Sequence, residues 1–429
     1  MKYENSLSFA KSLDRKDPLK KFRDKFLFPK HNGKNVIYFC GNSLGLQPKA
    51  VKKNILEELN AWGKYAVEAH FSGKNPWLSY HEMFAKPLAK LVGALPEEVV
   101  AMNQLTVNLH LLMVSFYRPV KNRYKIITET KPFPSDSYAL ESQVKFHGFN
   151  PDDAIIELQP RKGEHCLRTE DILSEIEKNK NALSLVMMGG VNYYTGQAFD
   201  MKKITAAAHK VGAICGFDLA HAAGNLKMSL HDWNVDFACW CSYKYLNSSP
   251  GGVAGVFVHT KHIKNNSLPR FAGWWGHDKT ERFKMEKGFN PIPTAEGWQL
   301  SNAPILAMAA HKASLDIFDE VGMDELVFKS EKLTEYLEFL IEEINKKLEI
   351  RNWKLEIITP ENKNERGCQL SIIAHGFGKN LFNKLLSKGI ISDWREPNVV
   401  RVAPVPLYNS FEDIFRFGKI LDEIIDENL

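Results

Sequence analysis

The chain has 429 residues, of which 44% are apolar and 25% charged, a composition typical of a soluble globular enzyme rather than of a disordered or fibrous protein. Its 56 Lys and Arg residues against 51 Asp and Glu residues leave a formal charge of +5, too small a surplus for a nucleic-acid-binding surface. We therefore expect a small metabolite as the partner and, at about 100 to 200 residues per domain, two or three domains.

The chain opens with a charged segment, MKYENSLSFAKSLDRKD, which has no apolar core followed by small residues. We therefore expect neither a secretory signal nor a transit peptide. The six cysteines are dispersed and form no C-x-x-C pair, which favours a reducing, cytoplasmic compartment over a disulfide framework or a zinc ribbon. Apolar runs such as 109–117 and 182–191 fall short of the about 20 residues that a membrane-spanning helix needs, so we expect no membrane partner.

The middle of the chain alternates between short apolar runs and longer amphipathic stretches or turns. The runs, rich in β-branched residues, are 124–128, 154–158, 184–188, 212–217, 237–241 and 253–259. This alternation predicts an α/β unit with a largely parallel sheet. No fixed-period repeat is found, which excludes solenoids and propellers.

Apolar residues recur at helical spacing over 302–319 and 324–348. We interpret the first stretch as a domain edge and the second as a long connecting helix. Strand-like runs at 353–359 and 368–374, a helix at 379–387 and a final helix from Phe411 follow. This mixture predicts a separate, smaller α+β domain of about a hundred residues.

The most informative segment is GFDLAHAAGNLKMSLHDWNVDFACWCSYKYLNSSPGGVAG, which begins at Gly216. One predicted strand ends at Asp218, and the next leads into Lys244. The carboxyl ends of such strands are where α/β folds place ligand contacts. A lysine in an apolar, aromatic setting must pair or lose its proton, and a deprotonated lysine attacks carbonyls. An Asp for a pyridinium nitrogen and a Lys for a Schiff base are what pyridoxal phosphate requires, so the segment predicts this cofactor.

Several blocks, spread from Tyr38 to Asp413, resemble the kynureninase family: YFCGNSLGLQP, LTVNLHLL, FPSD, NYYTGQ, FDLAHAAGN, DFACWCSYKYLN, GWWGH and RVAPVPLYN. The resemblance implies the type I fold of pyridoxal-phosphate-dependent transferases, with a large, mostly parallel-sheet domain and a smaller α+β domain. It also implies hydrolysis of the Cβ–Cγ bond of L-kynurenine or 3-hydroxy-L-kynurenine to anthranilate or 3-hydroxyanthranilate and L-alanine. Such an enzyme belongs to tryptophan catabolism or to the supply of NAD.

We therefore expect an N-terminal segment, 1–60, that packs with the small domain. A large domain, 61–325, should bind the cofactor, and a small C-terminal domain, 326–429, should complete the chain. The resemblance further implies a homodimer with its active sites at the subunit interface.

The resemblance also implies roles for individual residues. Lys244 is expected to hold the cofactor and take the substrate's Cα proton, Asp218 to face the pyridine nitrogen, and Tyr243 to contact the phosphate and relay a proton. The other cofactor contacts implied are Leu105, Thr106, Phe133, Pro134, Ser135, Asp136, His221, Trp274 and Asn302.

Three positions resemble substrate contacts. His70 and Asn302 are expected to line the pocket for the aromatic ring, and Arg401 to hold the carboxylate, a task that suits a bidentate guanidinium. We expect His70, Trp274 and Asn302 to serve the partner's site. Where some relatives carry a hydroxyl residue, this chain has Gly189, whose contacts must use its backbone.

Structural explanations stand beside these roles. Lys244 has an alternative as a surface lysine, and Arg401 as the partner of a local acid such as Glu396. Asp218 could instead be a helix cap and His221 a core histidine, or both could be metal ligands. No third His or Cys lies at a supporting spacing for a metal, so we predict no metal site. Rival functions are a cysteine desulfurase or class V aminotransferase of the same fold, and a non-catalytic cofactor-binding or regulatory protein.

Overall fold

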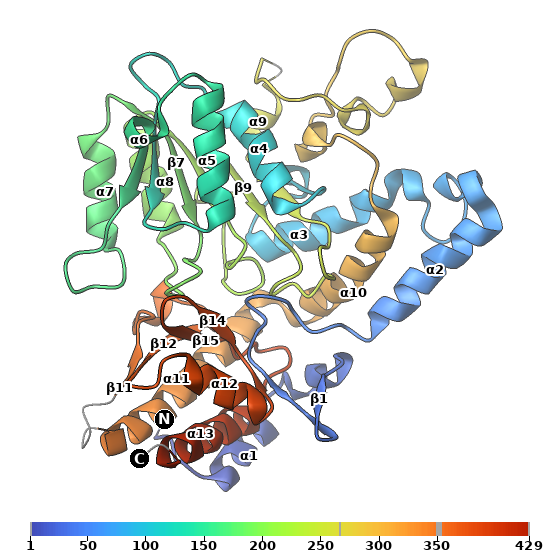
Figure 1. Ribbon diagram of the computed structural model, residues 1–429. Coiled ribbons are helices and arrows are strands. Elements are labelled where there is room, and N and C mark those ends of the chain that lie inside the picture. The colour runs from blue at the N-terminus through green and yellow to red at the C-terminus, as the bar shows by residue number, and fades with distance from the viewer. Residues whose placement is uncertain (1, 266, 349–353, 428–429) are drawn as a thin grey trace.

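The computed structural model describes residues 2–265, 267–348 and 354–427, arranged around two main sheets (Figure 1). The larger sheet has the order β4-β10-β9-β8-β7-β5-β6. Its strands are β4 (Val99–Ala101), β5 (Lys125–Glu129), β6 (Ile155–Leu158), β7 (Leu183–Gly189), β8 (Ile214–Asp218), β9 (Phe237–Trp240) and β10 (Gly255–Val258). Strands β6, β5, β7, β8 and β9 pair in parallel, whereas β10 is antiparallel to β9 and β4. The predicted, mostly parallel α/β sheet is confirmed.

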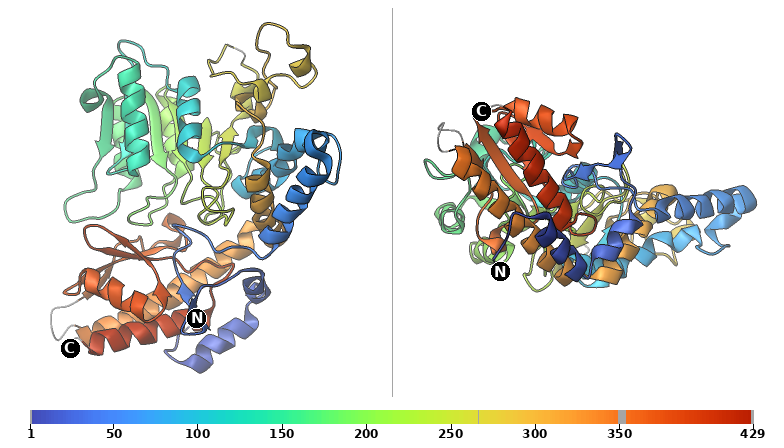
Figure 2. Two further views of the ribbon diagram at one scale, coloured as in Figure 1. Left: turned by 45° about the vertical axis from the view of Figure 1, so that its right-hand side comes forward. Right: turned by 90° about the horizontal axis from the view of Figure 1, so that it is seen from below.

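Helices cover both faces of this sheet (Figures 1 and 2). The helices of this part are α2 (Ala50–Tyr65), α3 (Ala85–Val92), α4 (Leu105–Phe116), α5 (Pro134–Phe146), α6 (Pro151–Ala154), α7 (Thr169–Lys178), α8 (Met201–Lys210), α9 (Thr260–Ile263) and α10 (Ile305–Val321), of which α2 packs on α10 beside the sheet. Leu185 and Met187 of β7 belong to a core shared with α4 and α5, whereas Val186 and Met188 belong to a core shared with α7 and α8. Burial on both faces explains why β7 is apolar throughout rather than alternating.

The smaller part contains an antiparallel sheet of order β11-β12-β15-β14. Its strands are β11 (Lys354–Ile357), β12 (Leu370–His375), β14 (Asp393–Arg395) and β15 (Val399–Val402), and its helices are α11 (Met323–Leu348), α12 (Lys379–Ser387) and α13 (Phe411–Asp426). The predicted strand at 353–359 begins at Trp353, which lies outside the described residues. No helix in the described ranges is long and apolar enough to cross a membrane.

The N-terminal segment joins both parts. Helix α1 (Leu7–Lys16) lies against α13, and β3 (Ile37–Tyr38) pairs in parallel with β13 (Ile390–Ile391). A short hairpin of β1 (Lys30–His31) and β2 (Lys34–Asn35) lies between them in sequence. Helix α2 instead packs on α10. The boundary expected after residue 60 therefore falls inside α2, so a segment end before Ala50 fits the packing better.

Most predicted elements are found within a few residues of their expected bounds. The helix predicted at 302–319 begins later, at Ile305, because Pro304 takes the N-cap position and disfavours a helical residue before it. The helix predicted from Phe411 begins there because Ser410 and Asp413 form a capping box. Strand β4 was not predicted, since three residues carry too little pattern.

Candidate active site

A cavity of about 100 Å³ opens at the carboxyl ends of β5, β7 and β8. Nine residues expected at a cofactor site line it: Leu105, Thr106, Phe133, Ser135, Asp136, Asp218, His221, Tyr243 and Lys244. Pro134, the first residue of α5, lies next to two of them but not on the cavity wall. A wider cleft of about 680 Å³, between α1 and the start of α13, contains none of these residues.

Lys244 and Asp218 are both buried in this cavity, so Lys244 is not a surface lysine. The Nζ atom of Lys244 lies 3.0 Å from Nε2 of His221 and 5.5 Å from the ring centroid of Phe133. Burial, followed by the charge of Lys244, lowers the pKa of His221 well below its usual value. A neutral His221 therefore accepts a hydrogen bond from Nζ of Lys244.

The carboxyl of Asp218 faces the same cavity and accepts a hydrogen bond from the backbone N–H of Ala220 at 2.7 Å. Burial raises the pKa of Asp218, while Lys244 and the Ala220 N–H act in the opposite direction. Burial and the negative charge of Asp218 raise the pKa of Asp136 well above its usual value. Of this pair, Asp218 is therefore the carboxyl that ionises first.

Two helix N-termini meet at another corner of the cavity. The Thr106 hydroxyl, in the first turn of α4, lies 2.6 Å from the Ser135 hydroxyl in the first turn of α5. Neither N-cap residue, Gln104 or Phe133, supplies a side-chain cap. The free backbone N–H groups of the first turn of α4 and the positive ends of both helix dipoles make such a corner suitable for a phosphate group; α5 contributes fewer N–H groups, because it begins with Pro134.

The residues present fit pyridoxal phosphate. Buried Oδ1 of Asp136 and Nδ1 of His221 have no hydrogen-bond partner among the described atoms, which leaves polar capacity for a bound molecule. Beside them the cavity offers an amine for an aldehyde, a carboxylate for a ring nitrogen and the aromatic ring of Phe133 for stacking.

Arg401, on β15, is fully buried behind the cavity. Its Nη1 donates to the backbone carbonyl of Tyr193 at 2.7 Å, and Nη2 lies 2.8 Å from Oδ2 of Asp393. Tyr193 lines the cavity, with its ring edge-on to Phe133 at 5.3 Å between centroids. The alternative of a pair with a local acid is therefore borne out with Asp393, and not with Glu396, whose exposed carboxylate contacts Lys379.

Besides Pro134 and Arg401, three further predicted residues do not line the cavity of a single chain. The His70 Nδ1 atom lies 2.9 Å from the carbonyl of Val67, and the indole N–H of Trp274 donates to the carbonyl of Arg282 at 3.0 Å. Asn302 is exposed just before α10. Within one chain, Trp274 therefore does not reach the cofactor pocket, and its N–H is already in use.

Some lining residues were not predicted: Glu129, Val191, Tyr193, Ala220 and Cys241. Tyr193 lies in the NYYTGQ block, which offered a signal. Glu129 carried no signal in the sequence, because polar residues commonly follow an apolar strand and an acid at that position does not by itself indicate a site.

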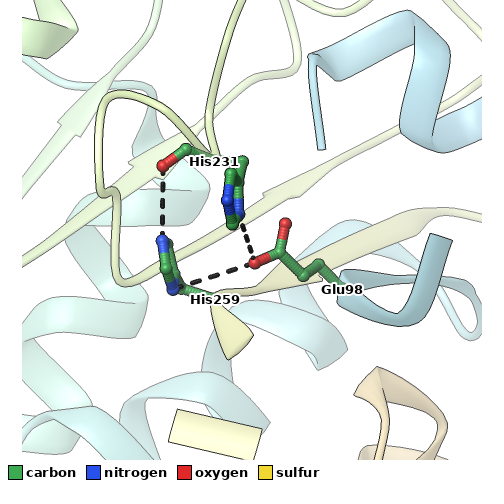
Figure 3. Close-up of side chains that lie close together, drawn as sticks. All are labelled: Glu98, His231 and His259. Atoms are coloured by element: carbon green, nitrogen blue, oxygen red, sulfur yellow. Dashed lines mark hydrogen bonds and ion pairs between the residues drawn. The ribbon is translucent and has the colours of Figure 1, made fainter. Parts of the chain in front are cut away.

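A separate cluster of Glu98, His231 and His259 brings three potential metal ligands within 4.8 Å of one another (Figure 3). Hydrogen bonds already use these atoms. Glu98 accepts from Nδ1 of His231 at 2.9 Å and from the N–H of Thr260 at 2.8 Å, and Nδ1 of His259 accepts from the N–H of Lys261 at 3.1 Å. The cluster therefore has a structural role in holding the start of α9.

A second group, His81, Glu82 and Glu296, also brings three such atoms together. Lys279 forms ion pairs with both carboxylates, at 2.7 and 2.8 Å, so a cation is already in place. The absence of a metal site stays a prediction.

Residues 326–421 match the model of the kynureninase C-terminal domain. The chain is 59% identical to a kynureninase of Flavobacterium psychrophilum, with 100% of each chain covered. The chain belongs to the kynureninase family. It is also 54% identical to the kynureninase of Myxococcus xanthus (98% of this chain, 97% of the relative) and 50% identical to that of Nematostella vectensis (97% and 93%).

Solved structures give this kynureninase family member its fold class. A cysteine desulfurase of Thermococcus onnurineus superposes with a TM-score of 0.73 at 19% identity, covering 91% of this chain and 95% of that one. A cysteine desulfurase of Escherichia coli gives 0.74 at 14%, covering 95% and 98%. The expected type I fold of pyridoxal-phosphate-dependent enzymes is confirmed.

Proposed function

We propose that the chain is a pyridoxal-phosphate-dependent hydrolase with kynureninase activity. It cleaves the Cβ–Cγ bond of L-kynurenine or its 3-hydroxy form and releases L-alanine with anthranilate or 3-hydroxyanthranilate. The observation that carries this proposal is the meeting of Lys244, Asp218 and two helix N-termini in one cavity, within a chain 59% identical to a kynureninase along its whole length. A structural neighbour, the C-DES protein, has been solved with glycine covalently linked to its pyridoxal phosphate.

Bound pyridoxal phosphate withdraws electrons from the substrate's Cα and so makes its proton acidic. The amine of Lys244 is the base for that proton, and the neutral His221 at 3.0 Å orients the amine. Asp218 holds a negative charge for the ring nitrogen, and the first turns of α4 and α5 bind the phosphate.

Tyr243 is the proposed acid that protonates Cβ after the bond is cleaved by water added at the side-chain ketone. It lines the cavity beside Lys244. Burial raises the pKa of Tyr243, with a further contribution from Cys241. The phenol therefore keeps its proton at neutral pH and has it available for donation.

Arg401 is the proposed partner of the substrate carboxylate. Its buried guanidinium already reaches the carbonyl of cavity-lining Tyr193, and its Nε has no partner among the described atoms. Nη2 already pairs with Asp393, so the unused Nε is the donor that this buried cation offers to an anionic amino-acid substrate.

We propose a homodimer whose interface completes the ring pocket. Large apolar side chains that are more than half exposed occur in the segments around His70 and Trp274: Trp62, Val67, Phe71, Phe271, Phe283 and Met285. Figures 1 and 2 show α2 and the segment around Trp274 projecting from the same side of the large sheet. An apolar surface of this kind needs a partner, and a second copy would bring His70, Trp274 and Asn302 to the facing cavity.

His70 and Asn302 offer polar groups for a ring hydroxyl, so we propose 3-hydroxy-L-kynurenine as the preferred substrate.

We also propose a cytoplasmic location, supported by six free cysteines. The proposed small domain, with the N-terminal segment packed against it, is supported by a hydrophobic core that α1 and β3 share with α11, α13 and the smaller sheet.

The rival desulfurase activity needs a reactive thiolate. Burial raises the pKa of Cys40 to about 12 and that of Cys166 to about 11. Cys241 lines the cavity, but burial raises its pKa too. These thiols stay protonated at neutral pH, which disfavours that rival.

Replacement of the cofactor lysine tests the proposed function. Lys244→Ala is expected to abolish turnover and to remove the visible absorption of the covalently held cofactor, because no other amine lines the cavity among the described residues. Lys203→Ala, at an exposed position on α8, is the matched control and should keep both signals. Turnover retained by Lys244→Ala would contradict the assignment.

A further inference from the structure

Glu129, Gly189 and Asp218 are the last residues of three neighbouring strands, β5, β7 and β8. Gly189 lies opposite Asp218 in the β7–β8 register, and β5 runs parallel along the other edge of β7. Adjacent strands are about 4.8 Å apart, so Glu129 and Asp218 flank the glycine with about 10 Å between their Cα atoms. Both carboxyls line the cavity that holds Lys244.

The missing side chain at Gly189 allows the Glu129 carboxyl to occupy this place. The N–H of Gly189 donates to both carboxyl oxygens, at 3.1 and 3.0 Å. A Cβ atom at position 189 would lie 2.8 Å from Oε1 of Glu129, closer than such atoms approach. A hydroxyl residue at this position would therefore displace the carboxyl, so the glycine and the glutamate depend on each other.

The cavity is lined by more carboxyl groups than can be ionised at the same time. Glu129, Asp136 and Asp218 are all buried, and Lys244 is the single Lys or Arg among the described residues of its lining. Like charges in a buried site repel, so three carboxylates against one cation cannot all form. Burial raises the pKa of Glu129 to about 7. The charge of Asp218 acts in the same direction, whereas hydrogen bonds from the backbone N–H groups of Glu129 and Gly189 and from the Thr128 hydroxyl act against it.

We propose that Glu129 is a positioning residue that acts through Asp218: held across Gly189, its carboxyl sets the charge that Asp218 presents to the bound cofactor. The inference rests on the proposed function, because it takes pyridoxal phosphate as the molecule in the cavity. The groups that face Glu129 are the Thr128 hydroxyl, the Gly189 N–H, Asp218 on β8, Asp136 on α5 and Lys244. Loss of the Glu129 proton adds a negative charge beside Asp218 and favours protonation of the ring nitrogen.

The visible spectrum of the bound cofactor, followed as a function of pH, tests this inference without turnover. The unmodified protein should show a spectral step near neutral pH. Glu129→Gln, which keeps an oxygen for the Gly189 N–H, should lose that step while the cofactor dissociation constant changes by less than about threefold. Glu157→Gln, the same change at an exposed position on β6 opposite Thr128, should retain it. An unchanged step in Glu129→Gln would overturn the inference.

Gly189→Ala tests the same coupling by a second route. The new Cβ should displace Glu129 and raise the cofactor dissociation constant about tenfold. In a Glu129→Ala background there is no carboxyl to displace, so Gly189→Ala should raise the dissociation constant less than about threefold. Equal increases in both backgrounds would contradict the inference. Failure of the unmodified protein to bind pyridoxal phosphate would instead contradict the proposed function, so the two failures are distinguishable.

Discussion

At the scale of single residues, the proposed contact of Arg401 with the substrate carboxylate leads to a specific kinetic prediction. Arg401→Lys keeps the charge but loses the planar pair of donors, which is worth about 1.5 to 3 kcal/mol toward a carboxylate. We expect KM for the substrate to rise about ten- to a hundredfold, with a smaller change in kcat. Steady-state kinetics measure this, with Arg161→Lys, in an exposed ion pair with Asp171, as the control. An unchanged KM would remove Arg401 from the substrate site.

The sequence could predict site residues whose chemistry is written in a linear motif. Asp218 and Lys244 follow apolar strands in a single segment, and the structure brings them into one cavity. Glu129 was missed as a site residue because its role arises from a neighbour distant in sequence, Gly189. Tyr193 lies in a block that offered a signal, but its contact with Arg401 is not visible in the sequence. Trp274 lies away from the cavity of its own chain, and the expectation that it serves the partner's site stays a prediction.

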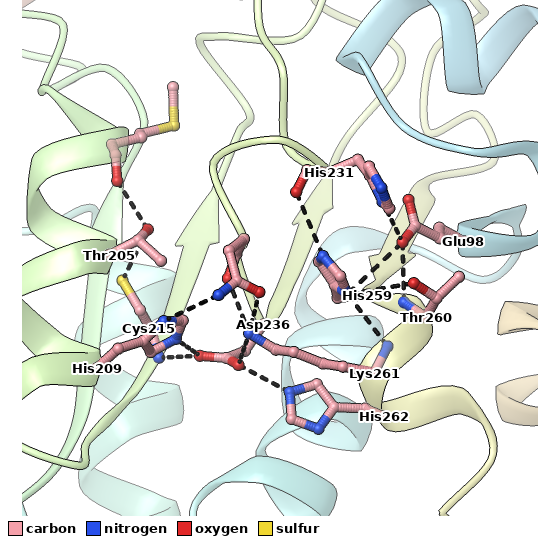
Figure 4. Close-up of polar contacts among 12 residues, drawn as sticks. Glu98, Thr205, His209, Cys215, His231, Asp236, His259, Thr260, Lys261 and His262 are labelled. Atoms are coloured by element: carbon pink, nitrogen blue, oxygen red, sulfur yellow. Dashed lines mark hydrogen bonds and ion pairs between the residues drawn. The ribbon is translucent and has the colours of Figure 1, made fainter.

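At the scale of elements, Asp236 joins β8 to α8 and α9 (Figure 4). Its carboxylate accepts from the backbone N–H of Cys215 and lies 2.7 to 2.8 Å from His209, Lys261 and His262. Burial raises the pKa of Asp236, but the hydrogen bonds of the two histidines and the charge of Lys261 outweigh it, so the net pKa is well below its usual value. This one side chain therefore holds three elements together.

Asp236→Asn should lower the free energy of unfolding by about 3 kcal/mol at neutral pH, because Lys261 loses its counter-charge and His209 and His262 lose a buried carboxylate acceptor. A carboxyl whose pKa is depressed by folding stabilises the protein above its unfolded pKa of about 3.9, and that contribution is lost as pH falls further. Urea unfolding measures the difference, which should shrink below about pH 4. Asp232→Asn, at an exposed position in the same loop, is the control. A difference independent of pH would contradict the ionic role.

Elements with a clear apolar period were predictable, but their pairing directions were not. The run at 253–259 gave strand β10 (Gly255–Val258), yet its antiparallel direction depends on the path between β9 and β4 rather than on its residues. Likewise, the continuation of α2 past residue 60 reflects its packing on α10, which no local pattern reports.

At the scale of the whole molecule, the exposed apolar side chains near His70 predict a dimer. Phe71→Glu would place an unpaired charge in the proposed interface and should raise the dimer dissociation constant at least about a hundredfold, with a parallel loss of activity. Phe146→Glu, at an exposed position on α5 outside that interface, should change neither property. Sedimentation at micromolar concentration reports the assembly state. A fully active monomer would contradict the shared active site.

The most direct test of the central claim is product release by the cofactor-loaded protein from L-kynurenine and from 3-hydroxy-L-kynurenine, followed by anthranilate fluorescence, 3-hydroxyanthranilate absorption and the alanine formed. We predict equal amounts of aromatic product and alanine, and a higher kcat/KM for the hydroxylated substrate. A preference for L-kynurenine would contradict only the ring contacts assigned to His70 and Asn302. No aromatic product from either substrate, with pyridoxal phosphate bound at Lys244, would contradict the proposed function itself.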